Sequence, residues 1–148
     1  MGTHRQARLI RSAVLGLGLA MACSSCSGPA PPHVDSEVGV TLKDFTVDMG
    51  TTEVPAGHIA FNVYNRGPST HEFLIVRTDL GSGGLPIGSD GLTVNEESAQ
   101  LELVKEDSEL DIGVSRALVV DLPPGHYVLY CNLEGHYLGG MHASLVVT

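Results

Sequence analysis

The sequence has few basic residues, few aromatic residues and no Trp. Eight of its 148 residues are Lys or Arg, against 17 Asp or Glu, which gives a formal net charge of −9. This balance argues against a nucleic-acid-binding protein, which typically has a basic face. With 43% hydrophobic and 17% charged residues, the chain is nevertheless too apolar for a disordered protein, and its length suits one domain.

The sequence also lacks the local motifs of several common enzyme classes. It contains no GxSxG, no HExxH and no phosphate-binding loop. We therefore expect a protein that is not an enzyme.

The first 22 residues predict a secretory signal peptide. Three arginines precede a short apolar run over residues 13–22, which is too short to span a bilayer comfortably as a mature helix. Removing residues 1–22 leaves five basic residues against 17 acidic ones, a net charge of −12. Such a surface favours a partner with a basic docking face, although solubility alone explains it equally well.

Cys23 directly follows the predicted cleavage point and resembles the lipid-attachment cysteine of bacterial lipoproteins. Cys26 is a weaker alternative, and cleavage without a lipid is a third possibility. Residues 23–36 are rich in Ser, Pro and Gly, so we expect a flexible tether. The predicted location is extracytoplasmic, at the cell membrane through the lipid, or otherwise periplasmic or secreted.

Residues 37–148 predict an all-β domain. Short stretches either alternate apolar and polar residues or run apolar, with Gly and Pro between them: 38–42, 59–63, 73–76, 118–120, 127–131 and 143–147. This pattern is typical of an antiparallel β-sandwich or barrel. Residues 81–91 predict a loop. Residues 95–107 fit a short helix capped by Asn95, or a strand in which Leu101 and Leu103 alternate, and we slightly favour a helix at the start of the segment.

A soft ligand set lies near the C-terminus. Cys131, His136 and Met141 are separated by four residues each. A thiolate, an imidazole and a thioether together favour copper over hard cations. A copper site of this kind needs a second imidazole, and His71 is the best candidate because it follows a Gly-Pro turn and leads into an apolar strand. The competing histidines are His58 and His126, which lie in turns, and His142, which should point to the opposite side of its strand from Met141.

At these residues the sequence resembles the cupredoxin family, over roughly Glu37 to Thr148. The likeness is most specific in residues 65–76 and 124–147, and the Cys-x4-His-x4-Met spacing is similar to that of rusticyanin- and sulfocyanin-like members. The resemblance implies a Greek-key β-sandwich with one type 1 copper ion. Its equatorial ligands are then His71, Cys131 and His136, and its axial ligand is Met141.

The flanking residues separate this chain from other copper proteins. Tyr130 and Asn132 stand beside Cys131, where multicopper oxidases carry His, and the loop has one Cys where a binuclear copper A site needs two. Many cupredoxins place Asn or Ser after the first His, where it bonds the Cys loop. Here Glu72 holds that place, and it either accepts from backbone amides or faces water.

The resemblance implies a carrier of single electrons between extracytoplasmic redox proteins. The alternative is a copper-binding protein for delivery, buffering or resistance. We expect His136 to be the electron port, with Leu133, Tyr137 and Leu138 as an apolar patch around it.

Overall fold

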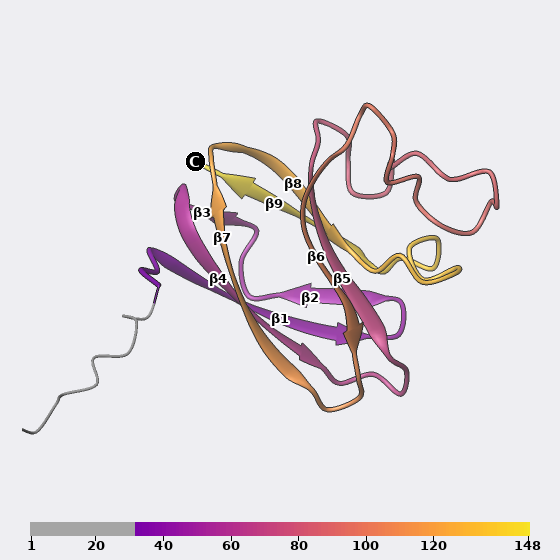
Figure 1. Ribbon diagram of the computed structural model, residues 1–148, viewed down its shortest axis with the longest axis horizontal. Coiled ribbons are helices and arrows are strands. Elements are labelled where there is room, and N and C mark those ends of the chain that lie inside the picture. Colours follow the sequence, from indigo (N-terminus) through magenta and orange to yellow (C-terminus); the bar gives the residue numbers. More distant parts are fainter. Residues whose placement is uncertain (1–31) are drawn as a thin grey trace, which may run out of the picture. The chain divides into compact units, whose positions relative to one another are not determined.

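The computed structural model describes residues 32–148, which form a sandwich of two β-sheets (Figure 1). Its strands are β1 (Ser36–Lys43), β2 (Thr46–Met49), β3 (Glu53–Val54), β4 (Gly57–Asn65), β5 (His71–Arg77), β6 (Glu102–Leu110), β7 (Ser115–Leu122), β8 (Gly125–Tyr130) and β9 (His142–Val147). No helix in this part of the chain has the length and apolarity needed to cross a membrane. The predicted signal peptide (1–22) and the lipidation site at Cys23 lie outside the described residues.

The strands of each sheet are not consecutive in the chain. One sheet has the order β2-β1-β4-β7, and the other has the order β3-β9-β8-β5-β6. Along residues 32–148 the chain changes sheet at five places: between β2 and β3, β3 and β4, β4 and β5, β6 and β7, and β7 and β8. The predicted all-β sandwich is confirmed. The sheets are mixed rather than purely antiparallel, because β1 pairs with β4, and β3 with β9, in parallel.

The main core lies between the sheets and follows the alternation in the sequence. On β1, Val38, Val40 and Leu42 are at most 2% exposed, while Gly39 between them is exposed. Burying one face of each strand is what removes apolar surface from water in a sandwich. Cys131 and Met141 belong to the same buried cluster, so the predicted sulfur ligands lie at the edge of a packed interior.

A second apolar cluster covers the outer face of β5 and β8. Leu74 and Val76 point away from the main core and pack with Tyr130, under Leu85 and Tyr137 from later segments. The run 73–76 is therefore buried on both faces, which explains why it is apolar throughout instead of alternating.

The expected helix in residues 95–107 was wrong. Residues 95–101 form consecutive turns, with the Ser98 amide donating to Asn95 and the Leu101 amide to Ser98, and β6 follows. The Asn95 side chain accepts from the Glu97 amide within such a turn, so it caps no helix. The free edge of β5 offers a full row of backbone partners to this segment, and that pairing overrides the helical spacing.

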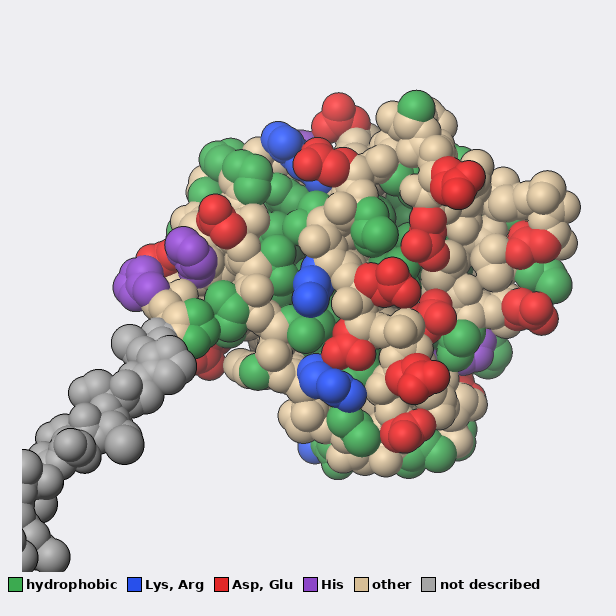
Figure 2. All heavy atoms as spheres, in the orientation of Figure 1, with side chains coloured by type: hydrophobic (Ala, Val, Ile, Leu, Met, Phe, Trp, Pro, Cys, Tyr) green, Lys and Arg blue, Asp and Glu red, His purple; other side chains and the backbone are tan. Residues whose placement is uncertain are grey.

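Acidic side chains dominate the face of the sandwich drawn in Figure 2, with few Lys or Arg between them. Glu102, Glu106 and Glu109 lie exposed along β6. The negative net charge of the sequence thus appears as exposed acidic side chains on this face.

Candidate metal centre

His71 is the first residue of β5, and a buried asparagine shapes the turn before it. The Asn65 side-chain amide donates to the carbonyls of Ser69 (2.8 Å) and Leu110 (2.7 Å), and its oxygen accepts from the Gly67 amide (2.8 Å). Asn65 and His71 are both 0% exposed. The turn therefore delivers the imidazole into the interior at one end of the sandwich.

Cys131 follows β8 and opens a loop that closes on itself. Its amide donates to the Met141 carbonyl (3.1 Å), and the Met141 amide donates to the His136 carbonyl (3.0 Å). Gly135 and Gly140 adopt positive φ angles of 77° and 105°, which side chains other than glycine rarely accept. These turns fold His136 back over Cys131.

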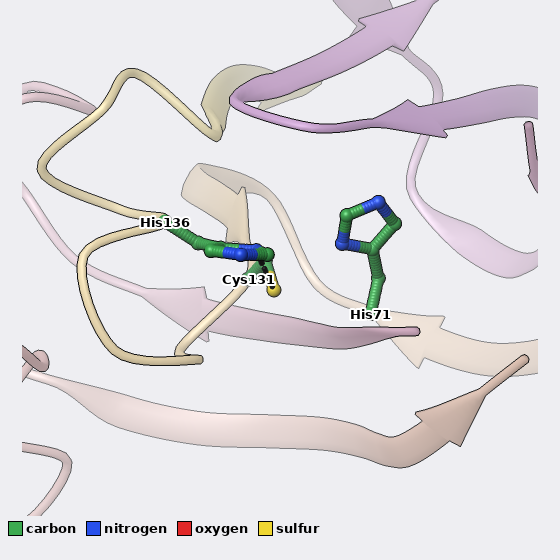
Figure 3. A group of neighbouring side chains, drawn as sticks. All are labelled: His71, Cys131 and His136. Carbon is green, nitrogen blue, oxygen red and sulfur yellow. Dashed lines mark hydrogen bonds between the residues drawn. The ribbon is translucent and has the colours of Figure 1, made fainter. Parts of the chain in front are cut away.

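The three side chains meet at one point (Figure 3). Donor atoms of His71, Cys131 and His136 all lie within 4.8 Å of one another. The Cys131 Sγ is 3.5 Å from the His136 Nδ1, and the two imidazole rings are 5.3 Å apart between centroids. Within residues 32–148, this is the one cluster of His, Cys and acidic donors with such spacing.

Met141 lies beside this cluster, fully buried, and its backbone bonds both Cys131 and His136. Its role as the axial ligand remains a prediction. The competing histidines lie elsewhere: His58 is exposed near Asp35, His126 is exposed on β8, and His142 packs against Tyr137 at 5.0 Å between ring centroids.

The protonation and hydrogen bonding of the buried donors suit a bound cation. Burial raises the pKa of the Cys131 thiol, and the backbone amides of Leu133 and Glu72 oppose this effect by donating toward the sulfur. Burial, followed by the charge of His136, lowers the pKa of His71. The buried His71 Nδ1 has no hydrogen-bond partner. A neutral imidazole with a free lone pair and a thiol that needs a positive neighbour fit a soft metal ion.

Glu72 supplies a contact to the cysteine through its backbone. Its amide is 3.4 Å from the Cys131 Sγ, in the position of a donor to the sulfur. Burial raises the pKa of its half-buried carboxyl, Glu106 and Glu96 add to the effect, and the Asn132 backbone amide opposes it.

Sequence reasoning missed the turn between β1 and β2. Phe45 is 50% exposed, and its ring lies edge-on to His136 at 5.4 Å between centroids. Its φ of 61° is unusual for a residue with a side chain. A Cβ at Gly139 would overlap the Phe45 ring, so the missing side chain there makes room for it. An isolated Phe in a turn has no sequence signal that reveals such a contact.

The apolar surroundings of His136 differ from the prediction. Leu138 is exposed, as expected. Tyr137 instead points inward: its hydroxyl donates to the Ser82 carbonyl (2.7 Å) and accepts from the Leu85 amide (2.9 Å). Leu133 packs against the main core. The exposed apolar residues near the half-buried His136 are therefore Leu138 and Phe45.

Solved structures share this architecture. Reduced auracyanin from the photosynthetic bacterium Roseiflexus castenholzii matches with a TM-score of 0.56 and 19% identity, over 78% of this chain and 99% of that one. Auracyanin B matches with a TM-score of 0.55 and 21% identity, over 80% and 93%. Rusticyanin from Thiobacillus ferrooxidans matches with a TM-score of 0.56 and 14% identity, over 76% and 77%.

No protein-family model and no curated protein sequence matches the chain. The likeness is therefore one of structure. Because the sequence identities are low, it shows the fold and nothing further. Together with the meeting of His71, Cys131 and His136 at one end of the sandwich, it confirms the predicted resemblance: this chain has the cupredoxin fold.

Proposed function

We propose that this protein carries single electrons through one copper ion held by His71, Cys131, His136 and Met141. The observation that supports this proposal is the meeting of one cysteine sulfur and two imidazoles inside a packed sandwich. A bound copper ion would supply a Cu(II)/Cu(I) couple, for which thiolate and imidazole are suitable ligands. A further structure of rusticyanin, which is described as a copper protein, matches with a TM-score of 0.55 and 18% identity.

The chain's contribution is a donor set fixed before metal arrives. His71 comes from the start of β5, and Cys131 follows β8, which pairs directly with β5. Hydrogen bonds of Asn65 and of the 131–141 backbone hold both ends in place. A rigid site changes little when an electron arrives or leaves, which keeps the reorganisation energy low.

His136 is the proposed route for the electron. His71 and Cys131 are buried, whereas His136 is partly exposed. Phe45 and Leu138, both about half exposed, present apolar surface beside it. A redox partner that covers this end would come within reach of the imidazole edge, and a basic face on that partner would suit the acidic surface.

We also propose an extracytoplasmic location, with residues 1–22 as a signal peptide, residues 23–36 as a tether and Cys23 as the lipid-attachment site. The support is the order of arginines, apolar run and cysteine in the sequence. The partners are redox proteins outside the cytoplasm. We propose transfer of electrons without catalysis, because the buried set of one sulfur and two imidazole donors suits a redox-active metal ion.

The test is the visible and EPR spectrum of the Cu(II)-loaded protein together with its voltammetry. We expect an intense thiolate-to-copper absorption band and a reversible one-electron couple, and we expect both to disappear in Cys131→Ser. The control His126→Gln changes an exposed histidine outside the cluster and should keep both signals. A colourless Cu(I) form that passes its metal to a chelator and shows no reversible couple would instead support copper delivery or buffering.

A further inference from the structure

The two-residue turn between β1 and β2 places a carboxylate next to the Nε2 atom of the His71 ring. Lys43 and Thr46 are paired across the turn, so Asp44 and Phe45 form its tip. The Asp44 Oδ1 lies 3.3 Å from the His71 Nε2. Neither atom has a well-aligned hydrogen bond to any group, and both are buried. Two unpartnered polar atoms of complementary type therefore face each other inside the protein.

The surroundings leave Asp44 as the acceptor for this nitrogen. A Cβ on Gly67 would lie 2.6 Å from the His71 Nε2 and 3.0 Å from the Asp44 Oδ1, so the glycine lets the two side chains approach. The second carboxylate oxygen of Asp44 accepts from the Ser69 hydroxyl at 3.2 Å. That bond holds the carboxylate in the turn, with its first oxygen directed at the imidazole.

The opposite side of the ring faces the cluster. Figure 3 shows the second ring nitrogen of His71 directed toward Cys131 and His136. This Nδ1 can ligate a metal only if the ring proton sits on Nε2. An acceptor at Nε2 selects that tautomer, and an anionic acceptor also makes the imidazole a stronger donor.

We propose that Asp44 is a positioning residue for the copper centre. Its carboxylate accepts a hydrogen bond from the Nε2–H of His71, which directs Nδ1 toward the metal and stabilises Cu(II) relative to Cu(I). The inference rests on the proposed function. An uncharged acceptor would orient the ring equally well but would add no negative charge. Because Asp44 is 30% exposed in its side chain while His71 is 0% exposed, the charge acts across a mostly desolvated contact.

The test compares two substitutions at this position. Asn keeps an oxygen that can accept a hydrogen bond from Nε2–H but removes the charge. Asp44→Asn should therefore raise the reduction potential and lower the ratio of Cu(II) to Cu(I) affinity by about tenfold or more. Ala removes both, so Asp44→Ala should also weaken Cu(II) binding by about 10–100-fold. The control Asp48→Asn changes an exposed carboxylate on the same hairpin and should leave potential and affinity unchanged.

A second measurement reads the contact without copper. In the metal-free protein, ¹⁵N NMR should show the His71 proton on Nε2 in the native chain and in Asp44→Asn, and a mixture of tautomers in Asp44→Ala. If the native protein fails to bind copper, the proposed function fails while this measurement still tests the contact. A potential for Asp44→Asn equal to that of Asp48→Asn, or a native His71 protonated on Nδ1, would overturn the inference.

Discussion

Asn65 shows how one buried amide can support a site that it does not join. It ends β4, and its side chain bonds the carbonyls of Ser69 and Leu110 and the amide of Gly67. All three bonds lie in or beside the turn that leads to His71. A buried amide with every bond satisfied fixes one conformation of a loop, because any other leaves polar groups unpaired.

Replacing Asn65 with Ala should lower the free energy of unfolding by about 1–3 kcal/mol, since the substitution leaves buried backbone groups without partners. Urea unfolding of the metal-free protein measures the loss. The matched control is Asn62→Ala on the same strand, where the side chain makes one exposed bond to Glu37 at 3.2 Å, and we expect a change below about 0.5 kcal/mol. Equal effects of the two substitutions would contradict the structural role of Asn65.

At the residue scale, the sequence pointed to the donor side chains that meet in the structure but did not reveal the residues that hold them in place. Cys131 and His136 share one short loop, and their donor chemistry is visible in their residue types. Asp44 carries no such signal, because an acidic residue in a turn is common and its link to His71 depends on how β1 approaches β5 in space. Tertiary contacts of ordinary residue types are what a single sequence conceals.

The long connection between β5 and β6 is an element without regular structure that is nevertheless fixed in place. The Asn132 side chain accepts from the Val94 amide at 2.6 Å and donates to the Val94 carbonyl at 3.2 Å. The Gly135 amide donates to the Leu92 carbonyl at 3.0 Å. The connection therefore covers the outer face of β5 and β8 and is bonded to the loop that carries Cys131 and His136.

Asn132→Ala should release this connection locally. Losing a bond worth about 1 kcal/mol predicts that the Val94 amide exchanges about fivefold faster with solvent, because its opening becomes easier. Hydrogen exchange followed by NMR measures the rate, and the Gly135 amide should also exchange faster.

The control for this prediction is Asn95→Ala in the same segment. Its side chain accepts from the exposed Glu97 amide and has no bond to Val94. Unchanged exchange at Val94 in Asn132→Ala would show that apolar packing, and not the asparagine, holds the connection.

The same segment explains the wrong expectation for residues 95–107. Leu101 and Val104 have helical spacing, and Leu101 and Leu103 have strand spacing, so periodicity alone could not decide. Leu103 is 44% exposed on β6, which shows that the strand forms without burying all its apolar residues. Residues 102–110 form a strand because the edge of β5 was available for pairing. Which strand edges are available depends on how the whole sheet is assembled.

At the scale of the molecule, metal binding and folding should be coupled. His71 lies far along the chain from the loop that carries Cys131 and His136, so the unfolded chain does not hold all three donors together. Cu(I) buffered at 100 times its dissociation constant should therefore raise the free energy of unfolding by about 2.7 kcal/mol. Anaerobic urea unfolding with and without Cu(I) measures the gain. Cys131→Ser should lose most of it, and an equal gain in that variant would place the metal elsewhere.

Strand β1 lies inside its sheet, between β2 and β4, although it is the first strand of the chain. From Ser36 to Leu42 it runs parallel to β4. A mechanical load applied before Ser36 would thus strain these backbone bonds together in shear instead of peeling them one by one.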